Sequence, residues 1–217
     1  MQNNKTKEFN WLSIAAELKA ISQAGKAFAK DVYEKQRHEK IEWLAAQILE
    51  RHTDLDADTI VSMLQKDCGY PTPKSDCRGV IFKDNKILLV KEIEDGGWTL
   101  PGGWCDVGST PAENVIREVW EESGYKVRVL KLLAVWDRNK QGHTPFYPFN
   151  IYKFFFHCEI IGGAPASSHE TSEIAFFGED EIPPLSQSRT MPHQIKRFFE
   201  HLRNPDLPTD YDYPDPT

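Results

Sequence analysis

The sequence has few cysteines, and their spacing excludes the common cysteine-based sites. Four cysteines occur among 217 residues, at positions 68, 77, 105 and 158, and no two of them are close enough to form a CxxC motif. A zinc cluster needs such close pairs, and a disulfide framework is typical of short secreted chains with a denser set. We therefore expect ordinary intracellular thiols.

Long apolar runs are also missing. No stretch approaches the roughly 20 consecutive apolar residues that a membrane helix needs, and the first residues, MQNNKTKEFNWL, lack the apolar core of a signal peptide. With 40% hydrophobic and 27% charged residues, the composition is that of a chain that folds in water. We expect a cytoplasmic protein with no membrane partner.

The chain has no excess of positive charge. It contains 26 Lys and Arg against 33 Asp and Glu, which gives a formal net charge of -7. Proteins that bind nucleic acid need clustered basic residues to displace counterions, so we do not expect nucleic acid as the main partner. An acidic protein still binds polyphosphates when its carboxylates hold divalent cations. The charge is therefore weak support for a metal site.

The first 70 residues have the pattern of a small helical domain. Residues 10–53 contain no proline, and their apolar residues recur at helical spacing in two groups, which predicts two helices. A third, shorter helix is expected over 54–65, before the prolines at 71 and 73 end the helical pattern. So small a domain has little core of its own, and we expect its apolar faces to form a homodimer through these helices.

The rest of the chain has an α+β pattern. Short runs rich in β-branched and aromatic residues begin near Cys77, and the first two are joined by the turn residues Asp84 and Asn85, which predicts a hairpin. A helix is expected over 192–202. We predict a second domain over 71–203 and a flexible Pro- and Asp-rich tail over 204–217.

The segment TPAENVIREVWEESGY predicts a helix with both ends marked. Thr110 and Glu113 have the spacing of a capping box, Pro111 occupies the first helical position, and Gly124 is a natural C-terminal residue. We therefore assign Glu113 to the cap rather than to chemistry.

Three carboxylates share one face of this helix. Glu118, Glu121 and Glu122 stand at i, i+3 and i+4, an arrangement that is costly unless cations neutralise it. Mg²⁺ and Mn²⁺ prefer such oxygen ligands and share their remaining positions with phosphates. The alternative is a solvated helix face. Gly103 precedes the helix in an exposed loop, and Arg117 is placed to bridge a neighbouring carboxylate, which favours the metal site.

These residues resemble the signature of the Nudix hydrolase family: Gly, five residues, Glu, seven residues, Arg-Glu, an apolar residue, any residue, Glu-Glu, any residue, Gly and an apolar residue. The positions that match are Gly103, Arg117, Glu118, Val119, Glu121, Glu122, Gly124 and Tyr125. Ser109 stands where the family has its first glutamate. In the family that glutamate commonly pairs with the signature arginine, so the orientation of Arg117 and the number of metal ions are open.

The resemblance implies an α/β/α sandwich with a mixed β-sheet and a pyrophosphatase that depends on Mg²⁺ or Mn²⁺. Its substrate would be a nucleoside diphosphate linked to another moiety, cleaved to a nucleoside monophosphate and a phosphorylated moiety. Nearly the whole chain is similar to a bacterial subgroup with a helical leader domain that dimerises. This subgroup includes a CDP-choline pyrophosphatase and ADP-ribose pyrophosphatase-like proteins.

The same resemblance implies roles for particular residues. The metal ligands would be Glu118, Glu121, Glu122 and the backbone of Gly103. The general base would come from the signature helix or from a later loop, which leaves Glu122, Glu170 and Glu173 as candidates. Arg117 and Glu121 complete the catalytic set.

The substrate-binding candidates are two arginines and several aromatic residues. Arg78 and Arg138 are candidates for phosphates that the metal ions do not reach, or else surface residues. Trp98 and Trp104 are the main candidates for stacking on a base, beside Trp136, Phe146 and Tyr147, although core packing is the more common role of a single aromatic residue. Two other functions stay open: a Nudix-fold nucleotide sensor without catalysis, and a phosphohydrolase acting on RNA.

Overall fold

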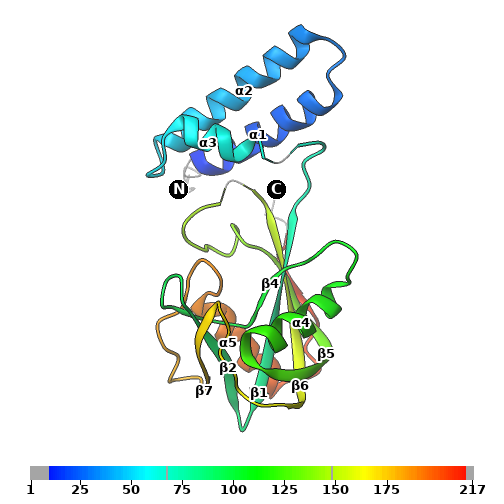
Figure 1. Ribbon diagram of the computed structural model, residues 1–217, viewed down its shortest axis with the longest axis vertical. Helices are drawn as coiled ribbons and strands as arrows, with labels where there is room; N and C mark the ends of the chain where they lie inside the picture. Colours follow the sequence, from blue (N-terminus) through cyan, green and yellow to red (C-terminus); the bar gives the residue numbers. More distant parts are fainter. Residues whose placement is uncertain (1–9, 67, 148, 214–217) are drawn as a thin grey trace, which may run out of the picture. The chain divides into compact units, whose positions relative to one another are not determined.

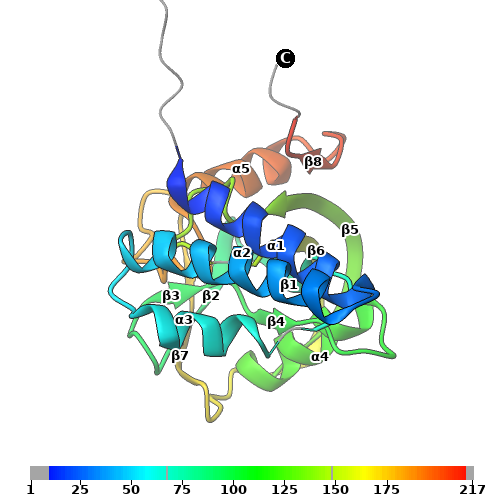
Figure 2. The same ribbon diagram turned by 90° about the horizontal axis from the view of Figure 1, so that it is seen from above.

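Three helices form the N-terminal unit, as the sequence predicts. The computed structural model describes residues 10–66, 68–147 and 149–213, and the chain divides after Thr72 into two compact units, two residues beyond the predicted boundary. Figures 1 and 2 show α1 and α2 packed side by side, with α3 against α2. The helices of this unit are α1 Trp11–Phe28, α2 Val32–Glu50 and α3 Ala57–Leu64.

Each of these helices begins at a polar cap. The side chains of Asn10, Asp31 and Asp56 accept hydrogen bonds from the backbone N–H three residues later. The helices of this unit bury small residues such as Ala15 and Ala45 and larger apolar ones such as Leu49 and Leu64. Other large apolar side chains of the unit, among them Phe28, Val32 and Tyr33, stay exposed in the single chain.

The second unit is built on a mixed sheet. In the described residues its order is β3-β2-β1-β6-β5-β8, with β4 paired to β1 and β7 paired to β2. Strands β1 and β6 run parallel, as do β5 and β8, whereas the other pairs are antiparallel. The elements are β1 Lys74–Lys83, β2 Lys86–Glu92, β3 Trp98–Thr99, β4 Gly102–Trp104, α4 Pro111–Ser123, β5 Tyr125–Asp137, β6 Ile151–Gly163, β7 Thr171–Phe177, α5 Pro192–Arg203 and β8 Asp210–Tyr211.

The predicted hairpin is confirmed between β1 and β2. Asp84 and Asn85 both have positive φ, at 50° and 58°, and Lys83 pairs with Lys86 across the two-residue loop. Two successive residues with positive φ are typical of the type I′ turn, whose twist matches that of the strands. Asn and Asp adopt this conformation more easily than most residues.

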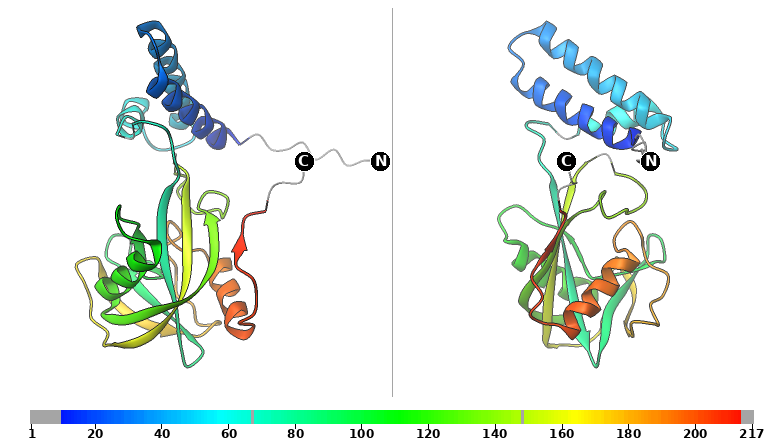
Figure 3. Two further views of the ribbon diagram at one scale, coloured as in Figure 1. Left: turned by 90° about the vertical axis from the view of Figure 1, so that its right-hand side faces the viewer. Right: turned by 180° about the vertical axis from the view of Figure 1, so that it is seen from behind.

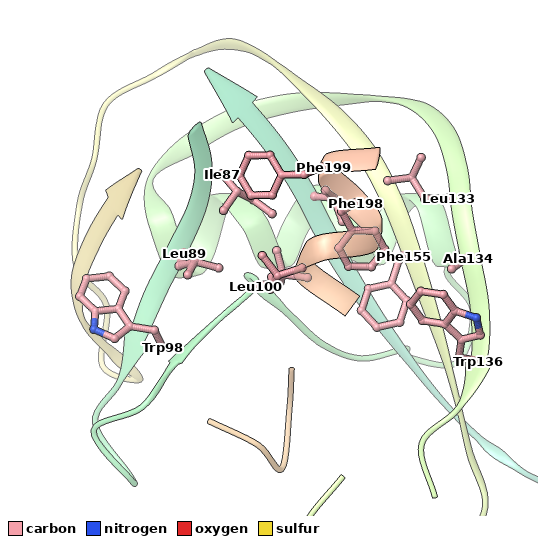
Figure 4. Close-up of a cluster of buried hydrophobic side chains, with 12 residues drawn as sticks. Ile87, Leu89, Trp98, Leu100, Leu133, Ala134, Trp136, Phe155, Phe198 and Phe199 are labelled. Carbon is pink, nitrogen blue, oxygen red and sulfur yellow. The ribbon is translucent and has the colours of Figure 1, made fainter. Parts of the chain in front are cut away.

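Helices α4 and α5 cover opposite faces of the sheet, which confirms the predicted α/β/α sandwich (Figure 3). Alternate residues of β2 point to the two sides: Leu88 packs in the cluster with Val119 of α4, and Leu89 packs in the cluster with Phe198 of α5. Figure 4 shows the α5 side, where Phe155, Phe198 and Trp136 lie together. The sheet thus has a hydrophobic core on each face.

Glycine at position 79 lets α4 approach β1 closely. A Cβ atom at Gly79 would lie 2.6 Å from Cγ2 of Val119, so any larger residue would push the helix away from the sheet. Val115 and Val119 are fully buried on this face of α4. The packing fixes which face of α4 turns toward the loop that carries β4.

The prediction of a flexible tail over 204–217 is corrected by β8. Asp210 and Tyr211 pair with Ala134 and Val135 of β5, and the Asp210 carboxylate accepts a hydrogen bond from Arg197 Nε at 2.6 Å. The acidic residue that suggested disorder is therefore held by an ion pair with α5. Residues 214–217 of the predicted tail lie outside the described residues.

Candidate active site

Helix α4 begins and ends where the sequence predicts. The Thr110 side chain accepts a hydrogen bond from the Glu113 N–H, and the Glu113 carboxylate accepts one from the Thr110 N–H at 2.8 Å, which completes the capping box. Gly124 ends the helix with φ of 75°, in the left-handed region. Glu113 therefore serves the cap, as predicted.

The three signature carboxylates, Glu118, Glu121 and Glu122, line one cavity of about 370 Å³, which we call the acidic cavity. Glu121 is on its exposed side, and Glu122 is only 5% exposed. Gly102 N–H donates to Glu122 Oε2 at 2.9 Å. Burial raises the pKa of Glu122 to about 8, although the nearby Arg78 cation acts in the opposite direction. Burial thus disfavours the charged form of Glu122, whereas the Arg78 cation and the Gly102 N–H favour it.

Arg117 is held by three carboxylates. Its Nη2 lies 2.8 Å from Asp106 and 2.8 Å from Glu118, and its Nη1 lies 2.8 Å from Glu121. Sequence reasoning left the orientation of Arg117 open because Ser109 replaces the family's first glutamate. Asp106, three residues earlier in the same loop, supplies the carboxylate instead. The sequence contains this aspartate, but only the loop conformation brings it to the arginine.

The predicted metal ligands face the cavity but do not form a ready-made cluster. Among residues 10–66, 68–147 and 149–213, no three His, Cys, Asp or Glu side chains are arranged to hold a metal ion, and two of the ligands are paired with Arg117. Their donor chemistry nevertheless fits Mg²⁺ or Mn²⁺, because all three are carboxylates around one cavity. A Cβ atom at Gly103 would lie 3.1 Å from Glu118 Oε2, so only glycine leaves this backbone fully open to the carboxylate.

The two later-loop candidates for the general base lie in different places. Glu170 lines the acidic cavity together with His169, whose Nε2 is 3.1 Å from its carboxylate. Glu173 instead accepts a hydrogen bond from Lys91 at 2.7 Å on the exposed surface of β7 and β2, and it is not among the described residues that line the cavity. Its position does not support a catalytic role, because strand alternation turns it outward.

Glu92 and Arg189 also line the acidic cavity, and sequence reasoning missed both. Glu92 is 7% exposed, and its Oε1 lies 3.1 Å from Arg189 Nε. Burial raises the pKa of Glu92, while Arg189 and Arg78 lower it. Glu92 ends an apolar strand and Arg189 lies in a loop far along the chain, so no local motif marks the pair.

The four predicted substrate-binding residues divide into three that line cavities and one in the core. Arg78 and Trp104 line both the acidic cavity and a second cavity of about 630 Å³, and Arg138 lines the second. Trp98 is 8% exposed and packs edge-on against Phe177, with ring centroids 4.8 Å apart. Figure 4 places it among the buried side chains. Its role as a stacking residue is therefore corrected to core packing.

Lys153 is the main residue of the second cavity that the sequence did not reveal. It lies opposite Asp76 in the β1–β6 register, and its Nζ donates to Asp76 Oδ1 at 2.6 Å. Burial lowers the pKa of Lys153 to about 8, against the effect of Asp76. Burial would raise the pKa of Asp76, but Arg78 and Lys153 outweigh it and lower it to about 2. A lysine in an aromatic strand carries no local signal of this burial.

The NUDIX domain model matches residues 73–202. The chain belongs to the Nudix family. A second model, the UDP-X-like N-terminal oligomerisation domain, matches residues 10–64. Each model therefore matches one of the two units of the structure. Nudix substrates are nucleoside diphosphate derivatives, and hydrolases of this family generally use divalent metal ions.

Three known proteins illustrate the similarity. The Bacillus subtilis protein named "Putative ADP-ribose pyrophosphatase YjhB" is 45% identical over 93% of this chain and 97% of its own length. A solved UDP-X diphosphatase is 31% identical, covering 93% of this chain and 98% of that one, with a TM-score of 0.61. A solved ADP-ribose pyrophosphatase from Streptococcus suis is 38% identical over 65% of this chain and all of its own, with a TM-score of 0.59.

No helix among the described residues is long and apolar enough to cross a membrane. The two-unit Nudix arrangement, with a helical unit before the catalytic fold, confirms the family resemblance drawn from the signature residues.

Proposed function

We propose that this Nudix protein is a metal-dependent pyrophosphatase that cleaves a nucleoside diphosphate linked to another moiety. The products are a nucleoside monophosphate and a phosphorylated moiety. The observation that carries the proposal is the cavity in which Glu118, Glu121 and Glu122 face the Gly102–Gly103 backbone. The ADP-ribose pyrophosphatases and the UDP-X diphosphatase among the relatives support substrates of the ADP-ribose and UDP-linked type. CDP-choline remains a further candidate.

The carboxylates of Glu118, Glu121 and Glu122, with the backbone of Gly103, would hold Mg²⁺ or Mn²⁺. When bound, such ions lower the pKa of a water molecule and offset the charge of the diphosphate. Arg117 positions the ligands, because it contacts the carboxylates of Glu118 and Glu121. Its ion pair with Asp106 would hold the guanidinium in place when Glu118 or Glu121 turns from the arginine to a metal ion.

Glu170 is the residue that we propose as general base. It lies in the wall of the cavity, and its side chain is 58% exposed, so it can reach a water molecule beside the substrate. Glu122 is the alternative, but its carboxylate is buried and already accepts the Gly102 N–H.

Matched glutamine variants test the base. We expect Glu170→Gln to lower kcat by on the order of 100-fold, the lower range for loss of a general base, with a small change in KM. Glu173→Gln, the same change three residues along, should stay near the wild-type rate because Glu173 pairs with Lys91 outside the cavity. Steady-state kinetics decide the matter. Equal effects of the two variants, or a full rate in Glu170→Gln, would move the role to Glu122.

The N-terminal helices are the proposed homodimer surface. Phe28, Val32 and Tyr33 are 68%, 59% and 70% exposed in the single chain, and the family model for this segment is an oligomerisation domain. Exposed apolar side chains gathered at one helix connection are typical of a protein contact.

Charge at this surface should separate the subunits. Wild-type protein is expected at twice the chain mass of 24.9 kDa by light scattering after size exclusion. The double variant Val32→Asp, Tyr33→Asp should elute at the single-chain mass, because burying carboxylates in an apolar contact is costly. Lys40→Glu, an exposed position on the same helix α2, serves as the control. A wild-type monomer, or an unchanged mass in the double variant, would contradict the proposal.

Substrate choice is tested by initial rates with Mg²⁺ or Mn²⁺. The compounds are ADP-ribose, a UDP-linked sugar, CDP-choline, a nucleoside triphosphate and an RNA with a 5′ triphosphate. The proposal expects metal-dependent release of a nucleoside monophosphate from at least one of the first three. Hydrolysis of the RNA alone would instead make the protein an RNA phosphohydrolase.

A further inference from the structure

The second cavity adjoins the acidic one. Arg78, Gly103, Trp104 and Arg189 line both, so a substrate whose diphosphate lies at the glutamates extends past these residues into the second cavity. With about 630 Å³ it has room for a further substrate group. We call it the cationic cavity, for the buried side chains described next.

Three buried cations line the cationic cavity against one buried carboxylate. Lys153, Arg78 and Arg138 are 2%, 5% and 6% exposed, and Asp76 is 5% exposed. Asp76 accepts hydrogen bonds from Arg78 at 3.1 and 2.8 Å and from Lys153 at 2.6 Å. One carboxylate therefore serves two cations, and the cluster keeps an excess of positive charge.

Arg138 is bound only by neutral groups among the described residues. Its guanidinium donates to the carbonyl oxygens of Ser188 at 3.3 Å and Pro145 at 2.9 Å, and to the side-chain oxygen of Asn139 at 3.2 Å. These bonds fix its orientation without neutralising it. A buried charge without a counterion is costly, so a protein that keeps one in a cavity wall gains from an anion there.

Lys153 has donors to spare. An ammonium group carries three N–H donors, and among the described residues Asp76 is the one acceptor in hydrogen-bond contact with it. The acidic residues at the rim do not reach these cations, because Glu94 and Asp95 pair with Arg189. The free donors of Lys153 and the unneutralised Arg138 belong to the same cavity wall.

We propose that the cationic cavity binds an anionic group of the substrate other than the scissile diphosphate. This group is a third phosphate, or a phosphate or carboxylate on the linked moiety. The inference rests on the proposed function for the position of the diphosphate. It adds a preference within that function: a choline-linked substrate, whose moiety is cationic, is disfavoured against one that carries an anion.

Anion binding without metal tests the cavity apart from hydrolysis. In EDTA the bare carboxylates of the acidic cavity repel anions, so binding of inorganic phosphate, measured by calorimetry at low salt, reports on the cationic cavity. We expect saturable binding by wild type that is at least about tenfold weaker in Lys153→Met and in Arg138→Met. Lys86→Met removes an exposed lysine at the far end of β2 and should bind as wild type does.

The outcomes are distinct. Absence of phosphate binding by wild type, or equal binding by all three variants, would overturn the inference. Thermal melts followed by circular dichroism check that the variants fold. If Lys153→Met does not fold, Arg138→Met alone decides, because its side chain has no ion pair to lose.

Matched substrates then identify the source of the anion. UDP-glucuronate and UDP-glucose differ by one carboxylate, and a nucleoside triphosphate and diphosphate differ by one phosphate. We expect a kcat/KM preference for the anionic member of one pair, reduced at least about tenfold in Lys153→Met. Hydrolysis of the members that lack the additional anionic group, with no preference in either pair, would overturn the inference and leave the proposed function intact. Phosphate binding without any hydrolysis would instead overturn the proposed function alone.

Discussion

Replacement of Glu121 by glutamine is expected to lower kcat/KM by roughly 100-fold. Loss of one carboxylate ligand removes on the order of 3 kcal/mol of charge stabilisation, and each 1.36 kcal/mol corresponds to about a factor of ten in rate. Glu121 lies on the exposed side of the acidic cavity, and its side chain is 45% exposed. The folded structure should therefore tolerate the change, with little shift in Tm.

The control for this experiment is Glu113→Gln on the same helix. The chemical change is identical, but Glu113 serves the capping box of α4. It should keep near-normal activity and lose at most about 1 kcal/mol of stability. Rates measured across a Mn²⁺ titration separate the roles, because a lost ligand raises the metal concentration needed for half-maximal rate. A Glu121→Gln enzyme with full activity at ordinary metal concentration would remove Glu121 from the site.

Replacement of Asp106 by asparagine is expected to lower kcat by about 10- to 100-fold, the usual effect of losing a residue that orients a metal ligand. Asp106 contacts Arg117 at 2.8 Å, and Arg117 in turn contacts Glu118 and Glu121. Without the aspartate the arginine loses the carboxylate partner that is not itself a proposed ligand and keeps a 3.3 Å hydrogen bond to Asn114 Oδ1. KM for the nucleotide should change less than kcat.

A second substitution makes this prediction specific. Ser109→Glu restores the family's first glutamate, and in the Asp106→Asn background it should recover most of the lost kcat by giving Arg117 a new carboxylate. Asp180→Asn, an exposed aspartate far along the chain, is the control and should behave as wild type. Failure of Ser109→Glu to restore any activity, with both variants folded, would show that Asp106 acts otherwise than through Arg117.

The elements that depend on local chemistry could be predicted from the sequence. The ends of α4 follow from Thr110, Glu113 and Gly124, and the β1–β2 hairpin follows from Asp84 and Asn85. In each case the residues that fix the conformation lie within a few positions of one another. The two-unit organisation followed from the switch between helical and β-type periodicity.

The parts of the site that depend on distant residues could not be predicted. Lys153 and Asp76 meet because β6 pairs in parallel with β1, a register that neither strand reveals alone. The sequence made Trp98 a candidate for stacking on a base. Its side chain is instead buried against Phe177, because β7 pairs with β2 and brings Phe177 to it. The tail was misjudged for the same reason, since the partner of Asp210 is Arg197 on α5.

Product analysis in water enriched in oxygen-18 tests the central claim most directly. The wild-type protein is incubated with Mg²⁺ or Mn²⁺ and the best substrate of the panel. The masses of the products are measured by mass spectrometry, and Glu121→Gln serves as the control. We expect a nucleoside monophosphate and a phosphorylated moiety, one of them carrying a single oxygen-18, and roughly 100-fold slower formation of both by the variant. Tight nucleotide binding with no labelled product from any compound would contradict it and indicate a Nudix-fold sensor.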